Sequence, residues 1–322
     1  MNPPAFIATA VAAAALALAS FGAAAQSFPA KTVRIVVPFP PGGTADALSR
    51  FTGEKLAVIF GKPVIVENRA GAGGNLAAEF VARAEPDGHT LLSSPPHLLT
   101  INHLLYKLAF DPAKLVPVSI IAAYPNVLLA GPKLQGSSLQ ELIAQARAHP
   151  GTLNIASQGN GTSSHLSAEL FKSMAGIDLG HVPYKGTAPA LTDLLGGQVE
   201  AMFDNLVTAM PHVKSGRLKL LGVGGAGRVA AFPDVPAIAE LLPGFRSETW
   251  MGIVAPPGTP PEIAAQLSAA VARAVQEPDF RRFITELQAE PVGSTPREMA
   301  EVVRQDTERW AQVIRAARIT IQ

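Results

Sequence analysis

Cysteine is absent from this sequence of 322 residues. Its absence excludes disulfide bonds, thiolate metal ligands, a cysteine nucleophile and the lipid-modified cysteine of bacterial lipoproteins. An excess of one charge is also absent, because 26 basic and 25 acidic residues give a net charge of +1, and only 6% of the residues are aromatic. Since the basic residues are scattered and not interleaved with aromatic ones, nucleic acid is not an expected partner.

The first thirty residues lack any charged side chain, and Lys31 is the first one. Residues 5–19 are mostly small or aliphatic, and residues 23–25 are all Ala, which is typical of a signal-peptidase site. We therefore expect a signal peptide over residues 1–25, cleavage near Ala25 and export to the periplasm. A membrane anchor or a buried helix are alternatives, but an Ala-rich run is only weakly apolar for a span of about 20 residues. No later apolar run is long enough to cross a bilayer, so the mature chain is expected to be soluble.

The mature chain of 297 residues exceeds what one core comfortably supports, which predicts two lobes. Short β-branched runs alternate with segments of helical period, the pattern of an α/β fold with a largely parallel sheet. Strands are predicted at residues 33–37, 64–66, 89–93 and 154–157, and helices at residues 45–60, 139–149, 163–175 and 296–316.

The chain is expected to cross twice between the lobes, at residues 120–126 and 248–254. This organisation predicts a first lobe made of residues 26–123 and 249–322, and a second lobe made of residues 124–248. Pro at the first turn predicts the starts of two closing helices, near Pro261 and Pro296, both packed on the first lobe.

A glycine-rich loop at residues 38–46 joins the first strand to the first helix. Its glycines let the backbone approach a ligand closely, and the following helix directs unpaired N–H groups and a positive dipole end at the same space. Such a helix entrance can bind an anion. A tight turn with Thr44 as N-cap and Asp46 favouring the helix dipole is the alternative. The candidate ligand-binding residues here are Phe39, Pro41, Gly42, Gly43, Thr44 and Asp46.

A second loop of this kind, residues 157–165, is expected on the opposite lobe. Two anion-seeking helix entrances facing one cleft would suit a dicarboxylate. His165 can contact the ligand or form an i,i+4 pair with Glu169. The candidates here are Ser157, Gly159, Asn160, Gly161, Thr162 and His165.

Further candidates follow two later strands. Tyr184 and Lys185 can reach the cleft, or they can lie at a partly exposed strand end. Asp204 and Asn205 lie at a strand-to-helix junction, where they can bind a ligand hydroxyl or ammonium group or cap the helix. We expect one of these two to be a cap.

Catalytic motifs are not supported. Residues 222–227 fit the dinucleotide pattern G-x-G-x-x-G, but Pro233 blocks the long helix that would hold a pyrophosphate. There is no G-x-S-x-G elbow, and the seven histidines show no H-E-x-x-H spacing. We therefore expect no cofactor, no metal and no enzyme activity. An exported enzyme that uses the same cleft and a ligand-sensing subunit for a signalling kinase remain the alternatives.

Taken together, these motifs resemble a known family along essentially the entire mature chain. The chain is similar to the extracytoplasmic solute receptors of the tripartite tricarboxylate transporters, often called Bug receptors. The resemblance rests on residues 36–46, 66–74, 86–92, 159–166, 181–186, 193–199 and 203–205.

The resemblance implies a type II periplasmic binding fold, in which two lobes, each with a mixed and mostly parallel sheet flanked by helices, are joined by a two-strand hinge. It implies a monomer that closes like a flytrap over a small carboxylate, held mainly by backbone groups, hydroxyls and bridging waters. Membrane transporter subunits are then the implied partners. One departure is Ser94-Pro95-Pro96-His97, where relatives often carry small polar residues, so ligand contacts at this loop are not carried over.

Overall fold

A computed structural model describes residues 28–286, 288–317 and 319–320. The predicted signal peptide, residues 1–25, lies outside them. Residues 31–322 form one unit, which is built on a ten-stranded sheet in the order β2-β1-β3-β9-β4-β7-β5-β6, with β8 and β10 also paired to β4. No helix within the described ranges is both long and apolar enough to span a bilayer.

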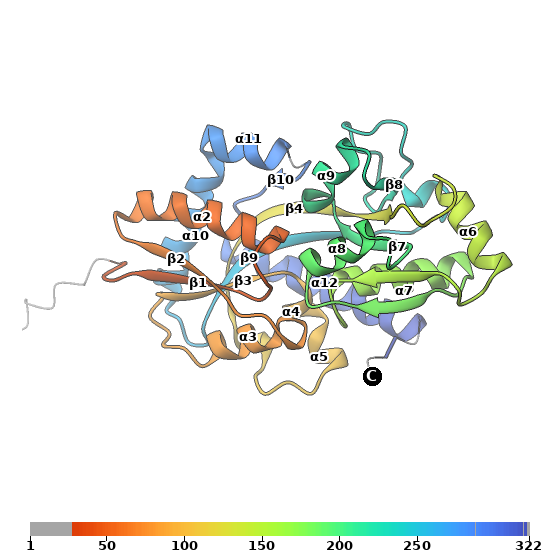
Figure 1. Ribbon diagram of the computed structural model, residues 1–322. Helices are drawn as coiled ribbons and strands as arrows, with labels where there is room; N and C mark the ends of the chain where they lie inside the picture. Colours follow the sequence, from red (N-terminus) through yellow and green to blue (C-terminus); the bar gives the residue numbers. More distant parts are fainter. Residues whose placement is uncertain (1–27, 287, 318, 321–322) are drawn as a thin grey trace, which may run out of the picture. The chain divides into compact units, whose positions relative to one another are not determined.

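The first lobe is built on β1, β2, β3 and β10 and the helices around them (Figure 1). Parallel β1 and β2 carry the β-branched runs that predicted them, and α2 ends at Gly61 in the left-handed conformation (φ 60°), as expected for a glycine C-cap. The elements are β1 (Val33–Val37), α2 (Thr44–Phe60), β2 (Val64–Asn68), η1 (Ala72–Gly74), α3 (Asn75–Ala82), β3 (Thr90–Ser94), α4 (His97–Thr100), α5 (Asn102–Leu105), η2 (Pro112–Lys114), α10 (Pro261–Gln276), α11 (Pro278–Glu286), β10 (Glu290–Pro291) and α12 (Pro296–Ala316).

The second lobe is built on β5, β6, β7 and β8. Helix α6 begins with the capping box that its sequence predicts, because Ser138 and Glu141 satisfy each other's backbone N–H groups. The elements are α6 (Leu139–Ala148), β5 (Asn154–Ser157), α7 (Ser163–Ala175), β6 (Gly180–Pro183), α8 (Thr187–Leu195), β7 (Ala201–Asn205), α9 (Leu206–Lys214), β8 (Lys219–Val223) and η3 (Ile238–Glu240). The segment after β8 contains no long helix, in agreement with the rejection of a dinucleotide site.

Strands β4 (Val116–Ala130) and β9 (Glu248–Ala255) join the lobes. β4 pairs with β9 as far as Pro125, and beyond Pro125 its partners are β7 and β8. The side chains of residues 127–130 alternate between the cores on the two faces of the second lobe, with Leu128 on one face and Leu129 on the other. The two predicted crossings are therefore confirmed as one long strand and one returning strand.

The two closing helices differ in what they cover. Helix α10 packs on α2 and β4, as predicted. Helix α12 packs on α4 and β4, but its Trp310 also shares a buried cluster with Leu166 of α7 in the second lobe. Both helices therefore pack on the first lobe as predicted, and α12 in addition contacts the second lobe. A helix of 21 residues is about 30 Å long, which is enough to span the junction.

Candidate functional site

A small cavity of about 20 Å³ lies between the two lobes, next to the strands that join them. A cavity of this size holds roughly one water, whereas small-molecule pockets measure roughly 300–1,000 Å³. In this structure the space between the lobes is therefore smaller than a small-molecule ligand needs. The lining residues are Phe39, Pro40, Gly43, Thr44, Ala45, Pro95, Tyr124, Gln158, Ser163, Thr187, Asn205, Thr249 and Met251.

The N-terminal ends of α2, α7, α8 and α9 all reach this cavity. Thr44, Ser163 and Thr187 are the first residues of α2, α7 and α8, and Asn205 is the N-cap residue of α9. The first N–H groups of a helix have no intrahelical acceptor, and together they carry about half a positive charge. These ends can stabilise an anion although no charged side chain lines the cavity.

Two polar side-chain atoms in the cavity wall have no hydrogen-bond partner. They are Oδ1 of Asn205 and Oγ1 of Thr249, in residues that are 6% and 3% exposed. A buried polar group without a partner costs about 1–3 kcal/mol, so its presence at a cavity wall indicates that something else satisfies it.

Asp204 lies directly behind the wall and does not line the cavity. Its carboxylate accepts hydrogen bonds from Gln158 Nε2 at 2.6 Å, Thr187 Oγ1 at 3.3 Å and Thr208 Oγ1 at 2.8 Å. Burial raises the pKa of Asp204 to about 6, although these bonds and that from the Asn205 N–H act in the opposite direction. The carboxylate is thus ionised at neutral pH and holds two cavity residues, Gln158 and Thr187, in place.

The first predicted loop supplies three lining residues, Phe39, Gly43 and Thr44. Pro41 and Gly42 are exposed beside the cavity. Gly43, and not Thr44, is the N-cap residue, and no side chain caps α2. This leaves the helix entrance open toward the cavity.

Asp46 is buried but faces away from the lining residues. It accepts hydrogen bonds from the Gly42 N–H at 3.1 Å, Arg50 Nε at 3.1 Å and Asn68 Nδ2 at 3.0 Å. Burial raises its pKa and these partners lower it more, so the pKa of Asp46 lies below its ordinary value. The geometry gives Asp46 the role of fixing the loop.

The second predicted loop supplies two lining residues, Gln158 and Ser163, neither of which was among its candidates. Thr162 caps α7 through the His165 N–H. Ser157 Oγ lies 2.6 Å from His181 Nε2, and the carbonyl of Asn160 accepts a hydrogen bond from the Tyr106 hydroxyl at 2.7 Å. The backbone of this loop therefore contacts the first lobe.

His165 stacks on His181, with ring centroids 4.1 Å apart, and its Nε2 lies 4.0 Å from Glu169. The N–H of Gly161 donates to His165 Nδ1 at 3.2 Å. Burial lowers the pKa of both imidazoles to about 4, so both are neutral at pH 7. His165 and Asn160 line a separate groove of about 520 Å³ and not the cavity between the lobes.

Tyr184 and Lys185 also lie outside the cavity lining. The Tyr184 hydroxyl donates to Asp193 at 2.7 Å, and burial together with Asp193 raises its pKa to about 12. Lys185 is exposed. Asn205 occupies the N-cap position of α9, but its side chain makes no capping bond, so the expected cap is wrong for this residue. Asp204 is also not the cap, because its carboxylate binds the side chains of the second lobe.

Three of the lining residues that sequence reasoning missed lie on the joining strands. Tyr124 and Thr249 are directly opposite each other in the β4–β9 ladder, and Met251 follows Thr249 on the same face. Pro95 belongs to the loop where the resemblance was set aside. Period-two alternation in β9 could have indicated Thr249 and Met251, once that strand had been placed at the cleft.

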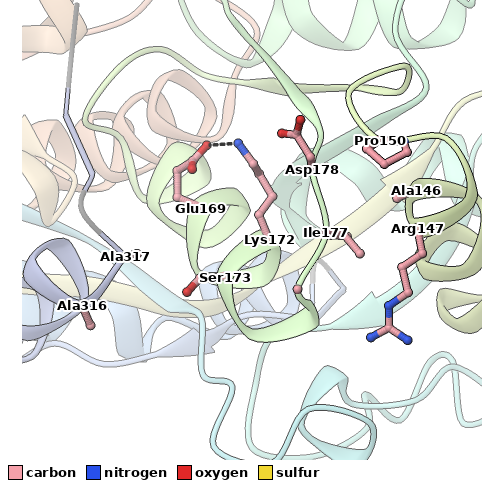
Figure 2. A pocket seen from close by; sticks show the side chains of 11 residues that line it. Ala146, Arg147, Pro150, Glu169, Lys172, Ser173, Ile177, Asp178, Ala316 and Ala317 are labelled. Carbon is pink, nitrogen blue, oxygen red and sulfur yellow. Dashed lines mark hydrogen bonds and ion pairs between the residues drawn. The ribbon is translucent and has the colours of Figure 1, made fainter.

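A larger groove of about 540 Å³ lies on the outer surface of the second lobe (Figure 2). Lys172 and Glu169 are paired there at 2.9 Å, and Arg147 donates to the carbonyl of Ala175. Three of its four charged side chains, Arg147, Glu169 and Lys172, thus have partners. The residues described by the structure contain no group of three or more His, Cys, Asp or Glu side chains placed to hold a metal.

Comparison with known proteins assigns the family. Residues 48–319 match the model of the tripartite tricarboxylate transporter family receptor. The chain belongs to this receptor family. It is accordingly a solute receptor and not an enzyme.

Three solved structures are similar to this receptor. Rpa4515 of R. palustris, with adipate, is 37% identical with a TM-score of 0.88, and the match covers 91% of this chain and 99% of that one. MatC of Rhodopseudomonas palustris, with bound malate, is 38% identical with a TM-score of 0.85 over 89% and 100% of the two chains. The periplasmic binding protein BugD is 31% identical with a TM-score of 0.87 over 92% and 100%. These matches confirm the predicted periplasmic binding fold.

Proposed function

We propose that this receptor captures a small carboxylate in the cavity between its lobes and that its closed form is recognised by the membrane subunits of a tripartite transporter. The observation that carries the proposal is the convergence of the α2, α7, α8 and α9 N-termini on buried Asn205 and Thr249 atoms that have no partner. Adipate bound to Rpa4515 and malate bound to MatC support the ligand class.

Closure is the proposed mechanism of capture. Hydrogen bonds cross between the lobes at the cavity, from the Tyr106 hydroxyl to the Asn160 carbonyl, from Asn205 Nδ2 to Thr44 Oγ1 and from Thr44 Oγ1 to Thr208 Oγ1. A ligand that contacts both lobes favours the closed form, because only there can it satisfy both walls at once. The proposed lobe boundaries fall at residues 123/124 and 248/249, close to where β4 changes its partner.

Export belongs to the same proposal. Residues 1–25 would be removed near Ala25, and the mature receptor would act as a monomer in the periplasm. The uncharged, Ala-rich leader supports export, and BugD is itself a periplasmic binding protein.

A thermal-shift and calorimetric screen of dicarboxylates, tricarboxylates, amino acids and aromatic acids tests this function. A ligand at about 100 times its dissociation constant stabilises the protein by roughly 2.7 kcal/mol. Binding by at least one acid, with the acid recovered unchanged, is expected. If a nucleotide or a metal ion binds and no acid does, the assigned site is wrong.

The Thr249 hydroxyl gives a sharper test at the site itself. Thr249→Val keeps the side-chain shape and removes a buried hydroxyl that has no partner, so the free protein should become more stable by about 1 kcal/mol. The same change should weaken binding of the acid severalfold, because the ligand loses a hydrogen bond.

Thr52→Val is the matched control. Thr52 Oγ1 is also buried without a partner, but it lies in α2 and does not line the cavity. This variant should gain stability and bind the acid with unchanged affinity. Equal affinity of Thr249→Val and wild type for every acid that binds would contradict the assignment.

A further inference from the structure

Two side chains in the second-lobe wall of the cavity, Thr187 and Asn205, present hydrogen-bond acceptors. An ionised carboxylate has no hydrogen to give, so Gln158 and Thr187 must donate to Asp204. Thr187 has a single hydroxyl hydrogen, which it has thereby used. It can offer only its lone pairs to the cavity.

A chain of hydrogen bonds from Asp204 through Thr208 and Thr44 fixes the orientation of the Asn205 amide. Thr208 Oγ1 donates either to Asp204 or to the Asn205 carbonyl, 3.2 Å away, so toward Thr44 it can only accept. Thr44 Oγ1 donates to Thr208 over 3.5 Å and accepts from Asn205 Nδ2 over 3.3 Å. The Asn205 amide is thus oriented with its nitrogen toward Thr44.

The consequence is that the nitrogen of the Asn205 amide is used on Thr44, which leaves its oxygen to accept. Oδ1 is buried in the wall and has no partner. A carboxylate oxygen cannot satisfy it, because both atoms only accept. The backbone N–H groups of the helix ends can serve the carboxylate, and the acceptor at Asn205 requires a separate donor on the ligand.

The buried negative charge of Asp204 also favours a hydrogen-bond donor on the ligand. It lies one hydrogen bond behind Gln158 and Thr187, and the cavity lining contains no cation to offset it. A second bare carboxylate placed at this wall would be repelled, whereas a hydroxyl hydrogen or an ammonium group would be attracted.

We propose that the ligand is a carboxylate whose adjacent carbon carries a hydrogen-bond donor, either a hydroxyl or an ammonium group. Asn205 Oδ1 accepts a hydrogen bond from this group. The hydrogen-bond chain through Thr44 and Thr208 orients the Asn205 amide. The inference rests on the proposed function and narrows its ligand class. Asn205 determines specificity, and Thr208 is a positioning residue.

Matched sets of acids that differ by one substituent test this inference by calorimetry on the full receptor. L-malate and L-aspartate are compared with succinate, L-lactate and L-alanine with propionate, and mandelate and phenylglycine with phenylacetate. In the set that fits the cavity, the hydroxy or amino acid should bind about tenfold or more tightly than the unsubstituted acid. Whichever of the hydroxy acid and the amino acid binds more tightly identifies the donor as a hydroxyl or an ammonium group.

Two variants then locate the source of the preference. The measured quantity is the affinity for the substituted acid divided by the affinity for the unsubstituted acid. Asn205→Leu and the isosteric Thr208→Val should bring this ratio toward one. The control Gln198→Leu, which removes an exposed amide outside the cavity, should leave the ratio unchanged. A ratio of affinities does not respond to a general loss of stability, which the melting temperature reports separately.

The outcomes are distinguishable. Unsubstituted acids that bind as tightly as their substituted partners would overturn the inference and leave the proposed function intact. A preference that survives Asn205→Leu would overturn the role of Asn205, and one that survives Thr208→Val would overturn the role of the chain. If no acid in any set or in the wider screen binds, the proposed function fails and this inference falls with it.

Discussion

At the scale of single residues, His97 shows how burial near the cavity changes an ionisable side chain. It is 1% exposed, its Nε2 lies 3.1 Å from the Gly73 carbonyl, and its ring lies 5.9 Å from that of Phe39 in the cavity wall. Burial lowers the pKa of His97 to about 4, and the bond to Gly73 acts in the opposite direction. The folded state therefore holds this imidazole neutral.

This pKa predicts a pH dependence of stability. Between about pH 6.5 and 4 the unfolded chain binds a proton at His97 that the folded state does not bind, so the free energy of unfolding falls as the pH falls. The lowered pKa values of His165 and His181 also reduce the unfolding free energy as the pH falls, whereas the raised pKa of Asp204 increases it.

Replacing His97 isolates its contribution to the pH dependence of the unfolding free energy. His97→Gln should reduce the slope of unfolding free energy against pH near pH 5 by about 1.4 kcal/mol per pH unit, which corresponds to one proton. Urea unfolding at a series of pH values measures this slope. An unchanged slope would show that His97 titrates alike in both states.

At the scale of elements, local sequence signals defined most of the helix ends. Residues 163–175 and 296–316 are helices as predicted, because Thr162 and Thr295 carry the capping hydroxyls that start them. Strands at residues 33–37 and 154–157 agree as well. These signals depend on neighbours within a few residues, which a single sequence contains.

The cavity wall depends on longer-range relations, and there the predictions were incomplete. Tyr124 was missed because the β4–β9 register shifts between Pro117 and Ser119 and again between Ile120 and Ala122. Each shift changes which side chains face the cleft, so simple alternation along β4 fails. Asp204 was expected to touch the ligand, but Gln158 and Thr187 lie between its carboxylate and the cavity. Their packing, which a single sequence does not reveal, places Asp204 one hydrogen bond behind the wall.

Helix α6 provides a test of capping that is separate from binding. Ser138→Ala removes the hydroxyl that accepts the Glu141 N–H, so the free energy of unfolding should fall by about 1 kcal/mol. Ligand affinity should not change, since α6 does not reach the cavity. Ser137→Ala is the matched control, because Ser137 contributes its backbone N–H to Glu141, which alanine retains. Equal losses in both variants, measured by urea unfolding, would contradict the capping role.

At the scale of the whole molecule, closure depends on close packing across the two lobes. A Cβ atom on Gly161 would lie 2.9 Å from Cε2 of Tyr106 and 3.0 Å from Oδ1 of Asn102, both in the first lobe. Cβ atoms essentially never approach other atoms so closely, so a substitution at Gly161 must displace Tyr106 or the first lobe that carries it.

Gly161→Ala should therefore weaken ligand binding. Overpacking costs about 1–3 kcal/mol, which corresponds to a loss of affinity of about fivefold to a hundredfold. Gly216→Ala is the control, since Gly216 has a similar φ of 72° against 77° at Gly161 but no atom within 4 Å of an added Cβ. Both variants carry the same backbone strain, and calorimetry should show weaker binding only for Gly161→Ala. Equal affinities would show that this packing does not control closure.

The position of β9 in the sheet also bears on how the chain folds during synthesis. β9 lies between β3 and β4 in the sheet, yet it follows β4 by more than a hundred residues in the chain. As the polypeptide lengthens from its N-terminus, β3 has no neighbour on one side until the entire second lobe has been made. Because long-range strand pairing is slow and unpaired strand edges invite aggregation, the second lobe should fold first and the first lobe should be completed last.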